Sequence, residues 1–253
     1  MGNFFNIILY QPLFNLLVFL YVTFQDLGIA TILMTIIIRT VLYPLFYKSF
    51  KNQTLMQKLQ PEVQKIQHDH KENREKQAQA LMDLYRRHKV SPFSGFLLIL
   101  VQLPILIVLY NLFLKGLTPE TFTNLYPFMT APQQIHSTFL GLIDLKNPSI
   151  LIVVLAVVLQ YIQSRLSLPK TDKMADSPAA RISRSMTIVG PILTLLILIR
   201  LPAAIGLYWL VSSGFSIGQQ LLINKKLKNN QKSGNNERRI QIENQNTSRT
   251  PSA

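Results

Sequence analysis

The sequence lacks cysteine altogether, which excludes disulfide bonds, thiolate catalysis and lipid attachment through a thiol. Histidine is scarce: the four are His68, His70, His88 and His136, and all lie outside the long apolar stretches. His68 and His70 are two residues apart, so on a helix they would not converge on one metal ion. A glycine-rich phosphate loop is also missing. Intramembrane metalloproteases, Ser–His proteases and proton relays therefore lack their residues, and we expect neither an enzyme nor a cofactor or metal.

Acidic residues are few: Asp and Glu total 12 against 26 Lys and Arg, a net charge of +14. None of the twelve falls inside an apolar stretch. Hydrophobic residues make up 48% of the 253 positions and gather in blocks of about 15 to 22 residues. Blocks of this length predict a polytopic helical membrane protein rather than a soluble core.

One apolar stretch, Leu27–Tyr47, contains a single charge, Arg39. As a helix its 21 residues would be ~31 Å long, enough to cross a hydrocarbon core of ~30 Å. Arg39 would then lie ~18 Å along the axis, past the midplane. An unpaired arginine there costs from ~3 to more than ~10 kcal/mol. Because no acidic residue lies within an apolar stretch to pair with Arg39, the sequence predicts a water-filled pocket in which Arg39 can bind a hydrogen-bond acceptor.

The fold predicted from these patterns is an all-α polytopic membrane protein. It has five transmembrane helices, an N-terminal interfacial helix and a cytoplasmic helical hairpin. Residues 1–26 form an extracytoplasmic N-terminus, in which Leu13–Phe24 is too short to span and is predicted to be the interfacial helix, beginning at Pro12. The core of five helices covers residues 27–223. Its spans are predicted at about 27–50, 93–114, 150–168, 185–199 and 203–222.

Two polar regions flank the spans. Residues 48–90 are rich in Gln, Lys and Glu, and their apolar residues recur at helical spacing on both sides of a non-periodic stretch at 68–73. This pattern predicts an antiparallel helical hairpin in water. Residues 224–253 are rich in Asn, Gln, Lys and Ser and predict a basic, disordered tail.

The distribution of positive charge predicts the orientation. With five spans, the side that holds the hairpin, the third-to-fourth loop and the tail carries 22 Lys and Arg, against 3 on the other side. The hairpin and tail are therefore expected in the cytoplasm and the N-terminus outside. The tail's net charge of +5 suits either ribosomal RNA or anionic lipid, and charge alone leaves both interpretations open.

Polar side chains within the spans have two interpretations: they bond helices to one another, or they line a cavity. Thr31 and Thr35 share a helical stripe with Arg39. Tyr208 and Trp209 also suit an interfacial aromatic belt. The other candidates are Gln102, Gln160, Gln163, Ser212, Ser213 and Ser216.

Short motifs over about residues 4–226 resemble, in the correct order, the YidC-type membrane protein insertases. They are Gln11-Pro12-Leu13-Phe14, Thr35-Ile-Ile-Ile-Arg39, Tyr43-Pro44-Leu45, Leu59-Gln60-Pro61, Ala80-Leu81-Met82-Asp83-Leu84-Tyr85, Val90-Ser91-Pro92, Gln102-Leu103-Pro104-Ile105, Leu109-Tyr110, Leu201-Pro202-Ala203, Gly206-Leu207-Tyr208-Trp209, Gln219-Gln220 and Ile223-Asn224. One departure is Gly95-Phe96-Leu97-Leu98, where the family usually has a cysteine and a proline.

The resemblance implies a hydrophilic groove that is open to the cytoplasm and to lipid and closed on the outside. Its residues would be Arg39, Thr35, Gln160, Gln163, Tyr208 and Trp209, to which we add the polar Ser212 of the last span. The hairpin, with Leu59, Pro61, Met82 and Tyr85, matches one that the family requires for activity.

The resemblance also implies partners and a location. Nascent membrane proteins would be the substrates, with the ribosome (through the basic tail), the Sec translocon and a targeting receptor as further partners. The location would be the bacterial plasma membrane. Insertion through a wet groove would need no nucleotide hydrolysis, because the groove lowers the cost of carrying a polar segment across hydrocarbon.

Two other functions suit the same residues. A small anion transporter or channel would use Arg39 as its substrate site, although the spans show no inverted repeat. A purely structural assembly factor would tolerate the loss of Arg39.

Overall fold

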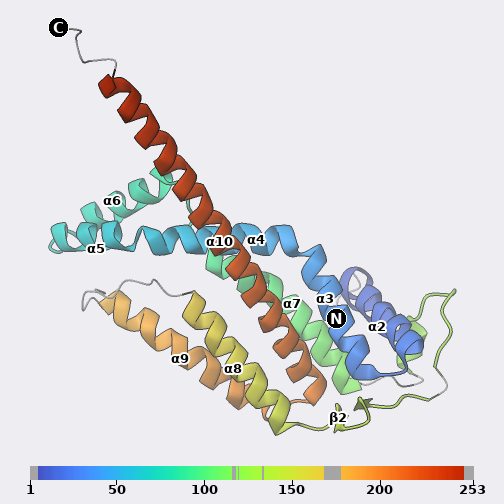
Figure 1. Cartoon of the computed structure of the whole chain (residues 1–253). Coiled ribbons are helices and arrows are strands. Elements are labelled where there is room, and N and C mark those ends of the chain that lie inside the picture. The colour runs from blue at the N-terminus through green and yellow to red at the C-terminus, as the bar shows by residue number, and fades with distance from the viewer. Residues whose placement is uncertain (1–4, 116–117, 119, 133, 168–177, 248–253) are drawn as a thin grey trace, which may run out of the picture.

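The computed structural model describes residues 5–115, 118, 120–132, 134–167 and 178–247 (Figure 1). Within these ranges the fold is helical except for one short antiparallel β-hairpin, in which Thr138 pairs with Asp144 and Phe139 with Ile143. The elements are η1 (Asn6–Tyr10), α2 (Gln11–Phe24), α3 (Leu27–Val41), α4 (Tyr43–Lys58), α5 (Gln60–Asp69), α6 (Arg74–Arg87), α7 (Ser94–Lys115), η2 (Thr121–Asn124), β1 (Thr138–Phe139), β2 (Ile143–Asp144), α8 (Ile150–Leu166), α9 (Pro178–Leu198) and α10 (Ala203–Thr247).

The N-terminal helix is longer than predicted. It begins at Asn6, not Pro12, because the π-helical turn η1 runs directly into α2 and tolerates the missing N–H of the proline. Together η1 and α2 form a 19-residue helix, Asn6–Phe24, with mean hydropathy 1.8. Within the described residues this is the one unbroken helix with the length and apolarity to cross a membrane. The predicted start of this helix at Pro12 was therefore wrong, and its interfacial position stays a prediction.

The predicted first span is broken. α3 ends at Val41 and α4 begins at Tyr43, with a bend of 68° between them. Pro44 explains the break, because it lacks an N–H and its ring clashes with the carbonyl one turn earlier. Arg39 consequently lies at the end of a 15-residue helix rather than deep inside a 21-residue one.

The count of five spans stays a prediction. Taken together, the bent pair α3–α4 also has the length and apolarity of a span, while the remaining apolar segments are shorter. These shorter segments are Leu100–Leu114, Ile150–Leu166 and Thr187–Leu198.

The last helix also differs from the prediction. α10 continues without interruption from Ala203 to Thr247, through most of the tail that was predicted to be disordered. The tail has no proline before Pro251, and extending an existing helix avoids the cost of nucleating a new one. Its Lys, Gln, Glu and Arg residues are also good helix formers.

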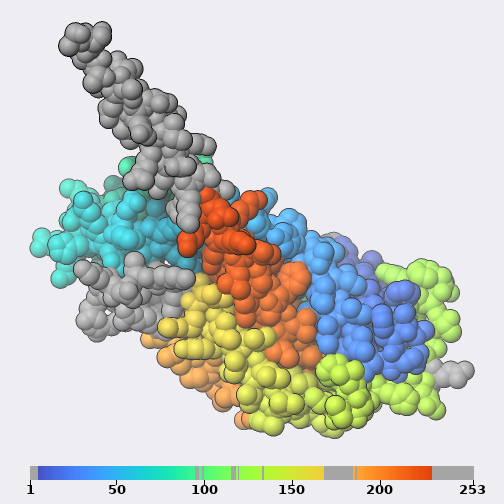
Figure 2. Space-filling view, in the orientation of Figure 1, coloured from blue at the N-terminus to red at the C-terminus, as the bar shows by residue number. Residues whose placement is uncertain are grey.

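α10 is the central element of the bundle. It packs against α3, α4, α7 and α8, and α9 packs on the outer side of α8 (Figure 1). Large apolar side chains on α8 and α9 are exposed, for example Leu155 at 45% and Leu193 at 56%. α5 and α6 pack on each other and project from the bundle, with the turn between them at residues 70–73 (Figures 1 and 2).

The described part of the long loop between α7 and α8 lies at one end of the bundle (Figure 1). We call this region the loop end; it comprises Asn15, Tyr21, Asp26 and the described residues of 118–145. The Asn15 side chain donates to the Asn124 carbonyl at 2.9 Å and accepts from the Tyr126 N–H at 2.8 Å. The Tyr21 hydroxyl accepts from the His136 N–H and donates to the Gln134 carbonyl.

Asp26 makes the third attachment of the loop end. One carboxylate oxygen accepts from the Ile29 N–H and caps α3, and the other accepts from the Leu140 N–H at 2.6 Å. Gly28 lies directly beneath Phe139: a Cβ at this position would be 2.1 Å from the Phe139 Cδ2. The hairpin β1–β2 therefore lies close against the start of α3.

Candidate functional site

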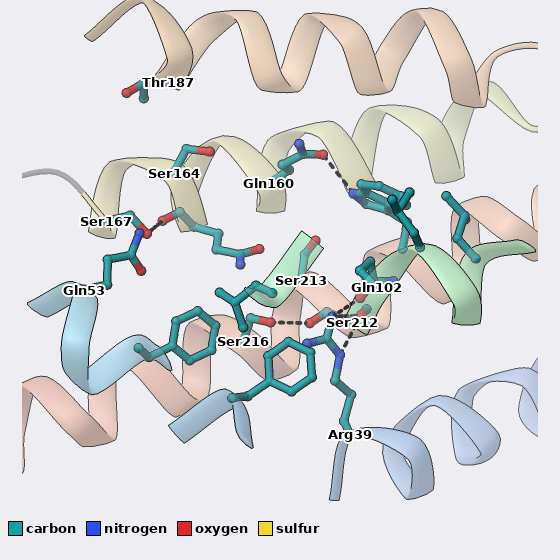
Figure 3. Close-up of a pocket in the computed structure, with 17 residues that line it drawn as sticks. Arg39, Gln53, Gln102, Gln160, Ser164, Ser167, Thr187, Ser212, Ser213 and Ser216 are labelled. Carbon is teal, nitrogen blue, oxygen red and sulfur yellow. Dashed lines mark hydrogen bonds between the residues drawn. The ribbon is translucent and has the colours of Figure 1, made fainter. Parts of the chain in front are cut away.

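A cavity of about 630 Å³ lies between α3, α4, α7, α8, α9 and α10 (Figure 3). Its wall contains both polar and apolar side chains. The polar side chains are Arg39, Gln53, Gln102, Gln160, Gln163, Ser164, Ser167, Thr187, Ser212, Ser213 and Ser216. The apolar ones are Phe46, Phe50, Leu98, Leu103, Leu106 and Trp209.

Arg39 reaches from α3 into this cavity and is only 7% exposed (Figure 3). Its Nε donates to the Ser212 hydroxyl at 2.7 Å, and its Nη2 bonds to the same hydroxyl. Nη2 also donates to the Gln102 Oε1 at 3.4 Å. The guanidinium carbon lies 4.4 Å from the centre of the Phe46 ring, a cation–π contact. The cation is thus held by neutral groups.

The cavity contains unmatched hydrogen-bonding atoms. The Nη1 of Arg39 is buried and has no hydrogen-bond partner within the described part of the chain, and the same is true of the Oε1 of Gln53. Across the described residues, no carboxylate lies within 4 Å of Arg39. A buried cation with a free N–H is costly unless water or a ligand reaches it. This cavity therefore has the chemistry of a site for an acceptor group.

Four predicted site residues meet in the cavity: Gln160, Gln163, Trp209 and Ser212 all line it together with Arg39. The Trp209 indole N–H donates to the Gln160 Oε1 at 2.8 Å, which joins α10 to α8 (Figure 3). The helical spacing of these residues on α8 and α10 places them on the faces that look toward the cavity.

Two predicted groove residues lie behind the cavity wall. Thr35 is fully buried, and its hydroxyl donates to the Thr31 carbonyl of its own helix at 2.7 Å. Tyr208 is 1% exposed, and its hydroxyl accepts from the Gln102 side chain at 2.7 Å. Neither side chain lines the cavity. Arg39 lies one helical turn after Thr35 on α3. Its long side chain reaches the cavity, whereas the short side chain of Thr35 does not.

The predicted hairpin residues are separate from the cavity. Leu59 is buried, Pro61 is exposed at the start of α5, and Met82 is 49% exposed on α6. Tyr85 is half-buried, and this burial raises the pKa of its hydroxyl. None of the four lines the cavity.

Sequence reasoning did not select several cavity residues, Gln53, Ser164 and Ser167 among them. Gln53 fell in the region assigned to the hairpin, and the bend at Leu42 brings it back toward the bundle. Near this position the Gln57 Nε2 bonds to the Ser167 carbonyl and joins α4 to α8. The amide side chains of Gln53 and Gln57 on α4 were the sequence feature that could have indicated this contact with the bundle.

The fold and the site define a class: helical membrane proteins whose buried arginine faces a partly polar cavity. The family model described as "60Kd inner membrane protein" matches residues 19–231, and the chain belongs to this family. Membership places it in a membrane. The resemblance to YidC-type proteins is confirmed by relatives that carry that name.

The "Membrane protein insertase YidC" of Geobacter metallireducens is 31% identical over 217 residues, which are 86% of this chain and 37% of that protein. The protein of the same name from Pelobacter propionicus is 31% identical over 217 residues, 85% of this chain and 38% of that protein. The chain thus spans little more than a third of the length of these relatives.

A solved structure titled "Active YidC insertase crystal structure with the first transmembrane domain resolved" superimposes with a TM-score of 0.58 at 23% identity. The match covers 87% of this chain and 46% of that one. At this identity the likeness shows a shared fold.

Proposed function

We propose that the protein is a membrane protein insertase and chaperone that moves nascent membrane proteins into the lipid bilayer. The cavity around Arg39 is the path of the substrate's polar segment, and it is open to the cytoplasm. The observation that carries this proposal is the buried Arg39, which is held by a hydroxyl, an amide and an aromatic ring and keeps Nη1 unmatched.

The charge of Arg39 suits this role. A carboxylate in the substrate's polar segment is costly to bring into an apolar medium without a partner. Neutral groups hold Arg39 without cancelling its charge, so a carboxylate that enters the cavity gains a charge-assisted interaction with the guanidinium. The attraction draws the segment inward, and its release requires only that the carboxylate reach water on the other side.

The polar and the apolar side chains that line the cavity suit the polar segment and the hydrophobic helix of a substrate. The glutamines and serines of α8 and α10 give a polar segment hydrogen-bonding partners. The apolar side chains of α4 and α7 can contact the hydrophobic helix of the substrate as it moves toward lipid. They include Phe46, Phe50 and Leu103. Transfer of the substrate helix to lipid releases ~25 cal/mol per Å² of apolar surface removed from water. No step of this route requires nucleotide hydrolysis.

The proposed orientation places the N-terminus outside and the hairpin and α10 tail in the cytoplasm. It is supported by the 22 Lys and Arg on that side of the predicted topology. The tail and hairpin would then lie where a ribosome, a targeting receptor and the Sec translocon meet a nascent chain. The tail's basic residues suit the ribosome in particular.

The experiment that tests this function is insertion into liposomes that contain only the purified protein. A single-span substrate with aspartates in its translocated segment is released from ribosomes, depleted of nucleotide and added, and insertion is measured by protease protection. We expect protected substrate with the native protein and at least a tenfold loss with Arg39→Ala, about 1.4 kcal/mol.

The matched control is Arg165→Ala, because Arg165 is an exposed arginine at the end of α8. Insertion that is equal with Arg39→Ala and with the native protein would overturn the proposal. If the liposomes instead take up a small anion, and Arg39→Ala abolishes that uptake, the anion transporter becomes the better answer.

A further inference from the structure

Tyr208 lies behind the cavity wall, yet it is connected to the cavity through Gln102. The Gln102 side chain donates from Nε2 to the Tyr208 hydroxyl at 2.7 Å. Its Oε1 accepts from the Arg39 Nη2 at 3.4 Å. The three residues come from α10, α7 and α3, so one amide connects three helices at the site.

The direction of this arrangement follows from donor and acceptor chemistry. A guanidinium only donates, so Gln102 must turn its oxygen toward Arg39. The amide NH2 then points the other way and needs an acceptor, which the Tyr208 hydroxyl supplies. Without that hydroxyl the NH2 is left unmatched beside a buried side chain, and the amide gains by rotating out into the cavity.

The consequence reaches Arg39. Ser212 holds the Nε and Nη2 side of the guanidinium and Phe46 covers one face, so Gln102 is the remaining contact. Together these contacts fix the plane of the guanidinium, while Nη1 is buried and has no hydrogen-bond partner within the described residues. Loss of the Gln102 contact frees the guanidinium to turn about its long side chain.

We propose that Tyr208 is a positioning residue that, through Gln102, holds the Arg39 guanidinium in one orientation at the cavity for a substrate carboxylate. This inference rests on the proposed function for the identity of the substrate. It differs from the role that the resemblance implies, in which Tyr208 is itself a residue of the groove.

The test uses Tyr208→Phe, which retains the buried ring and removes only the hydroxyl. Insertion is measured for a substrate with aspartates in its translocated segment and for the same substrate with asparagines. Tyr208→Phe is expected to lower insertion of the aspartate substrate about fivefold, the fold-change of one lost hydrogen bond, and to leave the asparagine substrate within about twofold. Tyr161→Phe, which removes an exposed hydroxyl on α8, is the control and is expected to change neither. An equal loss for both substrates, or no loss, overturns the proposal.

A second measurement does not depend on insertion. Phenylglyoxal modifies guanidinium groups, and peptide mass spectrometry reports the rate at Arg39 separately from other arginines. Tyr208→Phe and Gln102→Leu are each expected to raise that rate about fivefold, and the double variant no further than Gln102→Leu alone. An unchanged rate in Tyr208→Phe overturns the positioning role. If instead no variant or native protein inserts any substrate while the labelling rates change as expected, the proposed function fails and the positioning of Arg39 stands.

Discussion

The loop end and the cavity both bury polar side chains in apolar surroundings, but they treat them differently. At the loop end the side chains of Asn15 and Tyr21 are matched to backbone groups of the long loop, and each bridges more than a hundred residues of sequence. In the cavity Arg39 and Gln53 keep unmatched atoms. Matched polar groups stabilise one arrangement of the chain, whereas unmatched ones leave free energy for binding. The comparison therefore separates a structural region from a binding region within one bundle.

The largest effect on stability is expected from Asn15→Leu. The change retains the branched shape of the side chain but leaves the Asn124 carbonyl and the Tyr126 N–H unmatched, at about 2–5 kcal/mol in all. Thermal unfolding in nanodiscs measures the loss. Asn111→Leu is the control, since Asn111 bonds only to the Ile107 carbonyl of its own helix and is expected to cost about 0.5 kcal/mol or less. Equal losses of stability in the two variants would contradict a particular structural role for the loop end.

A smaller loss is expected from Gly28→Ala. The new Cβ would meet the Phe139 ring at 2.1 Å, and overpacking of this kind costs about 1–3 kcal/mol. Adding Phe139→Leu should recover part of the stability, as measured by the same unfolding transition. The control is Gly218→Ala on α10, where a Cβ meets nothing within 4 Å and helix propensity predicts a gain of about 0.5–1 kcal/mol. Destabilisation by both changes would show that the loop end is packed no more tightly than α10 at Gly218.

Arg39→Met should scarcely change stability while it strongly lowers insertion. Replacing a buried, unpaired cation by an apolar side chain of similar length is expected to alter unfolding by about 1 kcal/mol or less, in either direction. Insertion of an acidic substrate should fall at least tenfold, or about 1.4 kcal/mol. A variant that unfolds several degrees lower would instead make Arg39 a structural residue like Asn15.

The smallest effect is expected from Ser216→Ala. Ser216 lines the cavity, but its hydroxyl donates to the Ser212 carbonyl of its own helix at 2.9 Å and is already matched. Both unfolding and insertion should stay within about 0.5 kcal/mol of the native values. A large loss of insertion would mean that polar lining alone, rather than unmatched polar groups, determines function.

Residue patterns predicted an all-helical fold, because apolar length and helical spacing are local properties. Gln163 and Trp209 were assigned to the groove by the resemblance; both line the cavity, and their contact with a substrate stays a prediction. The break at Leu42 was missed, since residues 27–50 were predicted as one continuous span. Thr35 does not line the cavity, because a stripe that it shares with Arg39 on the helix does not determine how far each side chain reaches.

Other features of the site could not be predicted from the sequence, because they depend on tertiary contacts. Tyr208 was assigned to the groove from the resemblance, and only the packing of α10 against α7 shows that it bonds to Gln102. Gln53 was left out because the bend that returns α4 to the bundle is not visible in local sequence. The attachments of Asn15 and Tyr21 to the loop likewise span too much sequence to be read from spacing.

The most direct test of the central claim is photocrosslinking from neighbouring positions on α8. Gln163 lines the cavity, whereas Ile162 is 41% exposed and does not. A photoreactive residue is placed at either position in membranes that carry ribosomes stalled on a short membrane protein. Crosslinks to the nascent chain from position 163, lost in Arg39→Ala and at least several-fold weaker from position 162, are the predicted result. Equal crosslinking from both positions, unaffected by Arg39→Ala, would contradict the assignment of the cavity as the substrate path.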